Sequence, residues 1–436
     1  MSPQPLADRI RSHDARLAIV GQGYVGLPLA VEFARVGFRV TGLDTDLDRV
    51  GALNAGRSYI QDVASAELED LLGQGRYAAT GDAGVLADSD AVIICVPTPL
   101  GKSKDPDISF VMAAAEQVAA RLRPGQLVVL ESTTYPGTTE ELLLPLFEAR
   151  GRRVGRDFHL AFSPERIDPG NRSFPVRAIP KIVGGVTPAC RQLTALLYQQ
   201  IVSRVVEVAS PRVAELAKLY ENVFRNVNIA LANELALMCH RLGVSTRDVI
   251  DAAATKPFGF LPFYPGPGIG GHCIGIDPIY LAWKMRLSGY DSRFIQLADE
   301  INRAMPLRTV EMVAEALNRQ RLSVNGARVL ALGVAYKRDI GDMRESPALE
   351  VLARLRERGA VVSYADPHVP SVDAGDVVLK AVELTDRELV TADCVVILTD
   401  HSQVDYRHVV ETARLVVDMR NATWGIPAPD GRVIRV

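Results

Sequence analysis

The sequence predicts an α/β protein in which a central helical domain joins two Rossmann-like, doubly wound domains with parallel sheets. Three observations lead to this prediction. Short apolar runs alternate with helical patterns near both ends of the chain, a glycine fingerprint follows the first run, and one long helical pattern lies between the two halves. We therefore expect a first domain over residues 1–209, a central domain over 210–305 and a last domain over 306–436.

Composition narrows the class of protein. A chain of 436 residues, 48% of them hydrophobic, is long enough for several domains with full cores. The net charge of −3, without a long run of like charges, argues against nucleic acid as a partner. No uncharged apolar stretch reaches the length of about 18 residues that a transmembrane helix needs, and the first residues lack a signal-peptide core. Five scattered cysteines without C-x-x-C spacing argue against disulfides and a zinc site, so we expect no bound metal and a reducing cytoplasm.

The first element is a strand that runs into a glycine fingerprint. Residues Arg16–Val20 form a short apolar run, and the next six residues, 21–26, read G-x-G-x-x-G. A helical pattern follows, and then a second strand that ends at Asp44. Here the glycines permit a tight turn and leave room for a pyrophosphate at the helix N-terminus, while Asp44 accepts hydrogen bonds from ribose hydroxyls. Such an acid repels a 2′-phosphate, so the pattern favours NAD over NADP; FAD or a purely structural Rossmann unit is the alternative.

Three further strands end in polar residues that are candidates for the ligand edge of this sheet. Thr98, Thr133 and Glu165 each follow a short apolar run, and the carboxyl ends of parallel strands meet at the edge where ligands bind. Ordinary turn or helix-capping chemistry is the alternative for each hydroxyl. The runs span residues 91–96, 126–130 and 159–162, and another strand is expected at 205–208.

The longest element is a helical pattern from about Arg212 to Leu242, which exceeds what one domain needs. Its apolar residues lie nearly all round the helix, so we expect it to join two domains and to contact a second subunit. Lys218 and Asn222 are four residues apart and share a face. Both are costly to bury without a ligand or a partner, although a lysine that extends its amine to solvent is the alternative.

A stretch rich in glycine and proline, residues 263–278, contains Cys273, and Asp277 follows four residues later. Glycine lets the backbone approach a ligand closely and proline restrains a loop, so we interpret Cys273 as a candidate nucleophile. A small buried thiol in a turn is the alternative. Helical patterns follow at about 280–285 and 292–304.

The last third repeats the α/β pattern without the glycine fingerprint. A strand begins at Arg328 and a helix spans about 347–358. Basic residues take the place of the glycines after the first strand, which fits a different nucleotide. Lys337, Arg344 and Arg420 are candidate contacts for phosphate or carboxylate groups, and solvated surface charges are the alternative. The remaining strands are expected at 360–364, 394–398 and 415–418.

Together these pieces predict one chemistry. NAD accepts hydride from an alcohol, and that step needs no thiol. A thiol is needed to take an aldehyde on to an acid, because thiolate addition gives a thiohemiacetal, a second hydride transfer gives a thioester, and water releases the acid. We therefore expect a four-electron oxidation that consumes two NAD per substrate.

Several motifs occur in an order that is typical of one enzyme family. They are the fingerprint with Tyr24 and Val25, V-P-T-P at Thr98, S-T at Thr133, S-P-E at Glu165, Lys218 with Asn222, G-G-H-C at Cys273 with Asp277, Y-K at Lys337 and R-E-S-P at Arg344. With them the chain resembles the UDP-glucose/GDP-mannose dehydrogenase family over nearly its whole length. Residues 255–273 most resemble the UDP-N-acetylglucosamine 6-dehydrogenase branch, which makes uronic acid precursors for bacterial surface polysaccharides.

The resemblance implies a role for each matching residue. It implies that Cys273 is the nucleophile and that Lys218, with Asn222 beside it, stabilises charge on the C6 oxygen or acts as a base. Asp277 and Glu165 would handle protons and the hydrolytic water. The residues implied to bind NAD are Gly21, Gly23, Tyr24, Val25, Gly26, Asp44, Arg49, Thr98, Thr133 and, from the far domain, Arg344. Those implied to bind the UDP-sugar are Glu165, Lys218, Asn222, Tyr264, Gly268, Gly270, Tyr336, Lys337 and Arg420.

Two positions depart from the family pattern. Many relatives carry a second glutamate four residues after the Pro-Glu pair, where this chain has Pro169, with Asp168 one place earlier. Gly275 stands where relatives often have proline. Both departures concern fine positioning rather than the class of reaction, and whether Asp168 replaces the glutamate is open.

Two other functions are alternatives. A two-electron hydroxyacid dehydrogenase of the 6-phosphogluconate or 3-hydroxyisobutyrate type also bears Lys and Asn four apart, but it lacks the Gly-Gly-His-Cys loop and the third domain. The presence of Cys273, Lys218 and Asp277 argues against a non-catalytic nucleotide-sugar binder. For the sugar we expect UDP-N-acetylglucosamine, with UDP-glucose and UDP-N-acetylgalactosamine as alternatives, and we expect a homodimer or a higher homo-oligomer.

Overall fold

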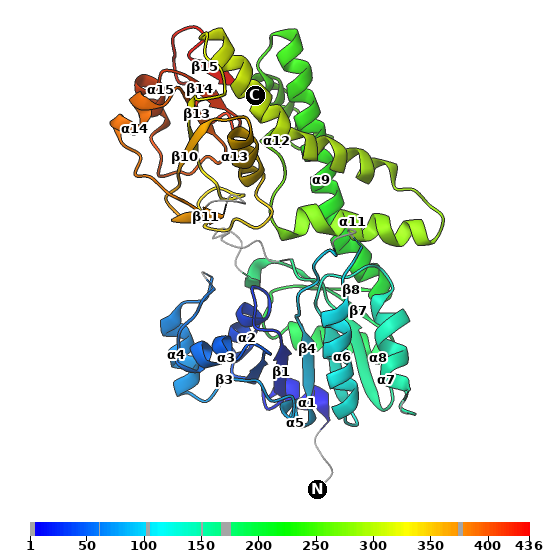
Figure 1. The fold of residues 1–436 in the computed structure, drawn as a ribbon. Coiled ribbons are helices and arrows are strands. Elements are labelled where there is room, and N and C mark those ends of the chain that lie inside the picture. The colour runs from blue at the N-terminus through cyan, green and yellow to red at the C-terminus, as the bar shows by residue number, and fades with distance from the viewer. Residues whose placement is uncertain (1–4, 61, 102–104, 150, 167–175, 374–377) are drawn as a thin grey trace. The chain divides into compact units, whose positions relative to one another are not determined.

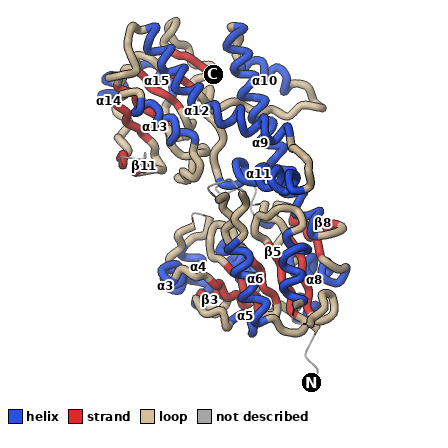
Figure 2. Tube along the Cα trace, turned by 45° about the vertical axis from the view of Figure 1, so that its right-hand side comes forward, coloured by secondary structure: helices blue, strands red, loops and turns tan. Residues whose placement is uncertain are grey.

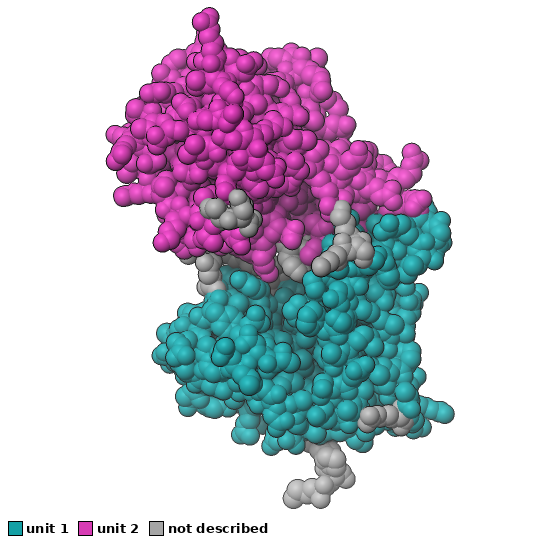
Figure 3. Space-filling view, viewed as in Figure 1, with its two compact units in different colours: residues 1–221, 279–290 teal, residues 222–278, 291–436 magenta. Residues whose placement is uncertain are grey.

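The computed structural model describes residues 5–60, 62–101, 105–149, 151–166, 176–373 and 378–436. The chain divides into two units, residues 1–221 with 279–290 and residues 222–278 with 291–436, which Figure 3 shows in different colours. The expected domain boundaries near 209 and 305 stay a prediction. None of the helices in the described ranges combines the length and the apolar character that crossing a membrane requires.

The first unit contains a mostly parallel, doubly wound sheet, which confirms the predicted Rossmann-like fold (Figure 1). Among the described residues the strand order is β3-β2-β1-β4-β5-β6-β7-β8, and β6–β7 is an antiparallel pair. The strands are β1 (Arg16–Val20), β2 (Arg39–Leu43), β3 (Tyr77–Thr80), β4 (Ala91–Ile94), β5 (Gln126–Leu130), β6 (Phe158–Phe162), β7 (Lys181–Gly185) and β8 (Val205–Val208). The helices are α1 (Leu6–Arg11), α2 (Gly26–Arg35), α3 (Leu47–Asn54), α4 (Ser65–Gly73), α5 (Val85–Asp88), α6 (Ser109–Arg121), α7 (Leu144–Glu148) and α8 (Pro188–Tyr198), with a π-helical turn at Thr139–Leu143 and a 3₁₀ turn at Val176–Ala178.

The side chains of alternate strand residues pack on opposite faces of this sheet. Leu17 and Ile19 of β1 belong to a core with α2 and α8, whereas Ala18 and Val20 belong to a second core with α6 and α7. Because both faces are covered, the central strands need apolar residues at every position. This is the physical reason why β1, β4 and β5 read as continuous apolar runs in the sequence.

Two strands of the sheet, β3 and β7, were not predicted. β7 ends in Gly184 and Gly185, and glycine is depleted in strands. A side chain at 184 would meet the backbone of Ser210 at 2.3 Å, so a close approach of two chain segments requires glycine there. Because β7 runs antiparallel to β6, its first residue, Lys181, lies at the same edge of the sheet as the carboxyl end of β6.

The second unit contains the other predicted parallel sheet, whose strands are red in Figure 2. Among the described residues its strand order is β10-β9-β13-β14-β15. Val329 and Ala331 of β9 pack in a core with α12 and α13, and Leu330 and Leu332 pack with α14 and α15. The strands are β9 (Arg328–Leu332), β10 (Val361–Ala365), β13 (Cys394–Ile397), β14 (Val416–Asp418) and β15 (Val433–Arg435), and β11 (Ser371–Asp373) pairs with β12 (Val378–Lys380). The helices are α10 (Thr246–Ala254), α12 (Arg293–Arg319), α13 (Pro347–Glu357), α14 (Asp386–Thr391) and α15 (Tyr406–Thr412).

Two long helices, α9 (Pro211–Leu242) and α11 (His272–Leu287), contribute residues to both units. α9 confirms the predicted helix almost to the residue. The predicted loop up to residue 278 was wrong, because α11 begins at His272 and includes Cys273 and Asp277. Pro278 has no N–H to donate to the carbonyl of Ile274, four residues earlier, and that carbonyl instead accepts from Asn226 Nδ2 at 3.1 Å. A partner from another helix therefore permits a proline that in the sequence indicated a loop.

Candidate functional site

The glycine fingerprint forms the turn between β1 and α2, and its glycines serve different purposes. Gly21 has φ +89°, and a side chain there would lie 2.6 Å from the Cys95 carbonyl oxygen. At Gly26 a side chain would lie 1.8 Å from the Gly21 oxygen, so packing within the protein requires both glycines. Gly23 has no atom within 4 Å of its open side. Protein packing does not require glycine there, whereas the close approach of a pyrophosphate to the backbone would.

Asp44 directly follows β2, beside this turn. Its Oδ2 accepts from the Gln22 N–H at 2.8 Å and its Oδ1 from the Asp46 N–H at 2.9 Å, which leaves further lone pairs for ribose hydroxyls. Arg49 Nη1 lies 3.9 Å from the same carboxylate, as the expected adenosine-side pair requires. Tyr59, which sequence reasoning missed, donates its hydroxyl to the Gln22 carbonyl at 2.6 Å. These residues fit a dinucleotide at the N-terminus of α2.

The structure brings together two predicted residues that were assigned to different ligands. Lys218 on α9 is 5% exposed, and its ammonium donates to the hydroxyl of Thr133, just after β5. Lys218 therefore does not extend to solvent, which removes the alternative interpretation. The backbone carbonyl of Thr98, another predicted residue of this edge, accepts from the Tyr280 hydroxyl at 3.0 Å.

In the second unit, asparagines on one face of α9 bind residues 263–278, the stretch around Cys273 that we call the cysteine segment. Asn222 Nδ2 donates to Asp277 Oδ2 at 2.5 Å, Asn226 binds the Ile274 carbonyl, and Asn233 Oδ1 accepts from the Gly266 N–H at 3.0 Å. Sequence reasoning found Asn222 and missed the other two. Their spacing of four and seven residues on one apolar helix was the signal, because it places all three on one face. Asp277, 1% exposed, is thus fixed within α11.

The glycines before Cys273 pack against the last part of the second unit. A side chain at Gly270 would lie 2.5 Å from Tyr336 Cβ, one at Gly268 would lie 3.0 Å from Pro347 Cβ, and one at Gly266 would meet the Arg420 guanidinium. Protein atoms thus already explain the missing side chains of Gly268 and Gly270, so that their contact with a sugar stays a prediction. Arg420 and Tyr336 are brought to this segment, as the predicted substrate site requires.

Gly270→Ala is expected to destabilise the second unit. The added methyl meets both Tyr336 Cβ and the Glu345 carbonyl oxygen within 3 Å, and overpacking of this kind costs about 1–3 kcal/mol. Gly275→Ala is the matched control, because nothing lies within 4 Å of its open side and alanine favours a helix by about 0.5–1 kcal/mol. Urea unfolding of both variants measures the difference. A Gly270→Ala protein as stable as Gly275→Ala would contradict the packing described.

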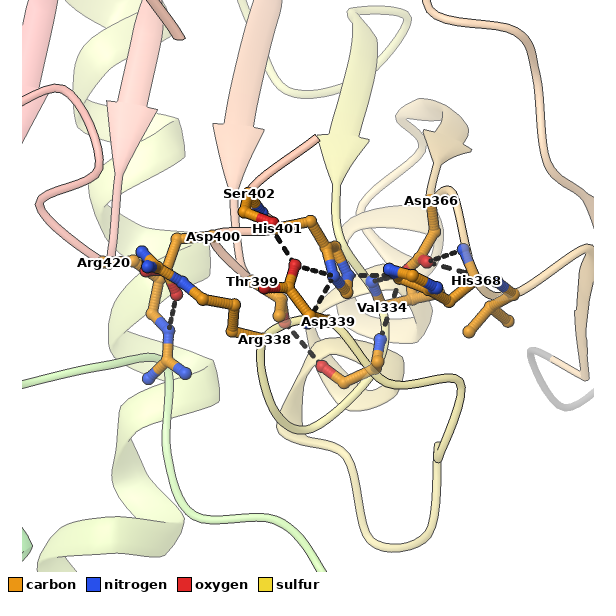
Figure 4. Close-up of polar contacts among 12 residues, drawn as sticks. Val334, Arg338, Asp339, Asp366, His368, Thr399, Asp400, His401, Ser402 and Arg420 are labelled. Atoms are coloured by element: carbon orange, nitrogen blue, oxygen red, sulfur yellow. Dashed lines mark hydrogen bonds and ion pairs between the residues drawn. The ribbon is translucent and has the colours of Figure 1, made fainter. Parts of the chain in front are cut away.

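Polar contacts order the loop after β9, which contains Lys337 (Figure 4). Asp366 Oδ2 accepts from the Val334 N–H at 2.7 Å and from His401 Nε2 at 3.1 Å. His401 Nδ1 accepts from the Asp339 N–H at 3.0 Å. Burial would raise the pKa of Asp366, but the hydrogen bonds from His401 and the backbone hold it below its usual range. Asp366 thus follows β10 as Asp44 follows β2, yet it also binds the ring of a buried histidine, which fits a nucleotide bound differently in this unit.

Asp339, His368 and His401 also have potential metal-ligand atoms within 4.8 Å of one another. Both ring nitrogens of His401 already have partners, since Nδ1 accepts from a backbone N–H and Nε2 donates to Asp366. A metal ion would have to replace one of these hydrogen bonds. The contacts of His401 are therefore explained by its support of the loop.

The other predicted site residues also divide between the first and the second unit. Glu165 and the fingerprint residues Tyr24 and Val25 lie in the first unit, whereas Tyr264 and Arg344 lie in the second. The Tyr264 hydroxyl donates to Asp251 at 2.7 Å, and the Arg344 guanidinium pairs with Asp342 at 2.7 Å. The backbone of Cys273 lies in the first turn of α11, four residues before Asp277. Asp168 and Pro169 lie outside the described residues.

Three consecutive parts of the chain match domain models of one known protein family. The model of the UDP-glucose/GDP-mannose dehydrogenase family, NAD binding domain, matches residues 15–202. The central-domain model of the same family matches residues 212–304, and its UDP binding domain matches residues 330–424.

Similar proteins agree in class and differ in the sugar they are named for. A UDP-N-acetyl-D-glucosamine 6-dehydrogenase from Pseudomonas aeruginosa is 39% identical, over 83% of this chain and 85% of its own length. A UDP-N-acetyl-D-mannosamine dehydrogenase from Pyrococcus horikoshii is 36% identical over 93% and 95%. A solved UDP-D-ManNAc dehydrogenase from Pyrococcus horikoshii matches with a TM-score of 0.87 and 33% identity, over 97% of this chain and 99% of that one.

Proposed function

The chain belongs to the UDP-glucose/GDP-mannose dehydrogenase family, and from this premise we propose that it oxidises the C6 hydroxyl of a UDP-sugar to the uronic acid in a four-electron reaction. It is an NAD-dependent UDP-sugar dehydrogenase. The observation that supports the four-electron reaction best is the hydrogen bond between Asn222 and Asp277. It joins α9, which bears Lys218 and Asn222, to α11, whose first turn includes the backbone of Cys273.

NAD supplies the hydride acceptor, and two molecules of it take up the four electrons that C6 loses. The chain's part is to bind and orient it. We propose that the turn at Gly23 and the N-terminus of α2 hold the pyrophosphate, and that Asp44 holds the adenosine ribose. The open side of Gly23 and the lone pairs left on Asp44 support this assignment.

Lys218 and Asn222 act on the C6 oxygen in this proposal. A lysine ammonium stabilises the negative charge that develops on this oxygen when the hydroxyl proton leaves. Lys218 is buried and bound to the hydroxyl of Thr133, so its ammonium group is held in a fixed position. Such preorganisation favours the charged transition state more than the uncharged substrate.

Cys273 acts as the nucleophile that takes the aldehyde to the acid. The thiolate adds to the aldehyde carbon, and after the second oxidation the same sulfur holds the acyl group as a thioester. Its backbone lies in the first turn of a 16-residue helix, and a helix N-terminus favours the thiolate form of a cysteine. This position supports the assignment more strongly than the loop expected from the sequence did.

Asp277 and Glu165 accept and donate protons in this proposal. Water must add to the thioester carbon, lose a proton and expel the Cys273 sulfur. We propose that Glu165 accepts the proton of this water and that Asp277, held by Asn222, returns a proton during the cycle. The nearly complete burial of the Asp277 carboxylate supports such a role, because proton-transfer groups require a controlled environment.

For the nucleotide of the substrate we propose the basic residues of the second unit. Lys337 lies in the ordered loop after β9, and Arg420 lies against Gly266 of the cysteine segment. A diphosphate bound to these cations would direct the sugar toward that segment. The relatives named for N-acetylglucosamine and N-acetylmannosamine support an N-acetylated hexose, and UDP-N-acetylglucosamine is our first choice.

The test is a panel of UDP- and GDP-sugars assayed for NADH and for uronic acid. The expected result is two NADH per sugar, with UDP-N-acetylglucosamine among the substrates used best. One NADH per sugar would indicate a two-electron dehydrogenase instead. Tight binding of a nucleotide-sugar without any NADH would indicate a binder that does no chemistry.

We also propose a homodimer or a larger homo-oligomer. Large apolar side chains along α9 are exposed in the single chain, among them Tyr220 at 66% and Leu231 at 59%. Light scattering that gives the mass of a single 47.3 kDa chain would contradict this proposal. A location in the cytoplasm stays a prediction.

A further inference from the structure

A buried group of charges adjoins Glu165 in the first unit. Glu131 and Lys181 form an ion pair whose side chains are 0% and 9% exposed. The Lys181 ammonium nitrogen also lies 3.6 Å from Glu165 Oε2. The Tyr198 hydroxyl donates to the second carboxylate oxygen of Glu131, and its ring centroid lies 5.2 Å from the Lys181 nitrogen. Lys181 thus has two carboxylate neighbours, one of which is the proposed proton acceptor.

The topology of the sheet creates this group. Glu131 directly follows β5, Glu165 comes after β6, and Lys181 is the first residue of β7. In the antiparallel β6–β7 register Phe162 is opposite Gly184, so the same register extended to the strand ends places residue 165 opposite residue 181. Strand ends are rigid parts of a fold, and groups attached there keep their relative positions. A parallel β7 would place Lys181 at the other edge of the sheet.

The group has two carboxyl groups, Glu131 and Glu165, and one ammonium group, that of Lys181. Burial raises the pKa of Glu131 to about 7, while Lys181 acts to lower it and Glu165 raises it further. Burial acts to lower the pKa of Lys181, but the charges of Glu131 and Glu165 raise it above its usual value, so that Lys181 keeps its proton. Two carboxyl groups therefore share one ammonium, and their titrations are coupled.

Two neighbouring titratable groups, the Cys95 thiol and the Tyr198 hydroxyl, add no charge to this cluster. Burial raises the pKa values of Cys95, after β4, and of Tyr198, on α8, well above their usual range. Both stay uncharged at neutral pH. The guanidinium of Arg166 pairs with Glu221 at 2.7 Å, while its backbone N–H donates to Glu165 Oε1 at 2.6 Å. Lys181 is thus the cation of this group, and its ammonium lies within ion-pair distance of Glu165.

We propose that Lys181 is a positioning residue, whose ammonium, anchored by Glu131 and Tyr198, keeps the Glu165 carboxylate ionised and in place to take the proton of the hydrolytic water. This inference rests on the proposed function, which makes Glu165 that proton acceptor. The proton leaves the water as its oxygen bonds to the thioester carbon, and it passes to Glu165, while Lys181 keeps its own protons. Glu131 limits the effect, because its negative charge opposes ionisation of Glu165.

The test compares Glu131→Gln with the double variant Glu131→Gln/Lys181→Met. The two proteins differ in the ammonium alone, and neither has the Glu131 charge without a partner, so both are expected to fold. NMR of protein with ¹³C-labelled glutamate follows the titration of Glu165, whose signal is assigned by its loss in Glu165→Gln. We expect Glu165 to titrate at least about one pH unit higher in the double variant, since an opposite charge within a few ångströms shifts a carboxyl pKa by about 1–3 units. Equal midpoints in the two variants would overturn the proposal.

Kinetics supply the second readout. In the double variant the rate of acid formation is expected to rise with pH about one unit later than in Glu131→Gln, with the KM for NAD unchanged. Lys181→Arg, which keeps the charge, is expected to keep the wild-type pH profile. A loss of rate at every pH without a shift of the profile would show a merely structural lysine and overturn the proposal. If Glu165 titrates as expected and no UDP-sugar is oxidised, the proposed function fails while the charge coupling of Lys181 stands.

Discussion

Cys273→Ser is expected to stop uronic acid formation, with a loss of ~10⁴-fold or more, the scale seen when a covalent nucleophile is removed. A serine hydroxyl stays protonated where a thiol ionises, so addition to the aldehyde is slow and the adduct does not go on to release the acid. Residual oxidation is expected to end at the aldehyde or at a trapped intermediate, with no more than one NADH per sugar. Mass spectrometry of the products and of the protein, together with NADH absorbance, checks both expectations.

A second cysteine provides the control for this experiment. Cys394 in β13 is fully buried, and burial raises its pKa to about 12, so it has no thiolate at neutral pH. Cys394→Ala is expected to lose some stability and to keep the turnover number of the wild type, whereas Cys273→Ala is expected to lose acid formation. Normal turnover by Cys273→Ser, or an equal loss in Cys394→Ala, would end the assignment of Cys273 as the nucleophile.

Lys218→Ala is expected to lower the turnover number by about 10²- to 10⁴-fold, the range typical of a lost general acid–base or charge-stabilising group. The lysine acts on the C6 oxygen and not on the cofactor in our proposal, so the KM and the dissociation constant for NAD are expected to change little. Steady-state kinetics with NAD and the UDP-sugar varied separately, and fluorescence titration with NADH, measure the two effects.

The control for Lys218 is a lysine outside the proposed site. Lys380 is exposed at the end of β12, and Lys380→Ala is expected to match the wild type in both measurements. Thr133→Val removes the hydroxyl that holds the Lys218 ammonium and is expected to give a smaller loss of turnover than Lys218→Ala. Equal losses of turnover and of NAD affinity in Lys218→Ala would indicate that Lys218 serves structure rather than chemistry.

Much of the fold was predictable, because strand and turn patterns are local. β1, β5 and β8 have the predicted bounds, and the fingerprint lies between β1 and α2 as expected. The errors occurred where a distant partner overrides a local pattern. Pro278 indicated a loop, yet it lies inside α11 because Asn226 binds the carbonyl that lacks its usual donor. β7 was not predicted because its glycines, which the backbone of Ser210 requires, hide its strand character.

In the candidate site, too, features that depend on local sequence were predictable, and those that depend on distant partners were not. Residue type and spacing indicated Asp44, Lys218, Asn222 and Cys273, since each stands in a motif whose chemistry is recognisable within a few residues. The partners of these residues were not predictable in the same way. Thr133 was expected at the cofactor and binds Lys218, and the glycines expected to admit a sugar pack against Tyr336 and Pro347. The helical spacing that indicated Asn233 was overlooked, and Lys181 gave no local signal.

The sequence was thus sufficient for the two α/β units, the dinucleotide turn, the cofactor and the class of reaction. All of these follow from periodicity and short motifs, which depend on residues close together in the chain. The partners of the charged groups required the folded chain, because Glu131, Glu165 and Lys181 lie on separate strands. Their contact depends on the order of β5, β6 and β7 and on the reversed direction of β7. No local sequence pattern predicts the direction of β7, because that direction results from the packing of the whole sheet against its helices.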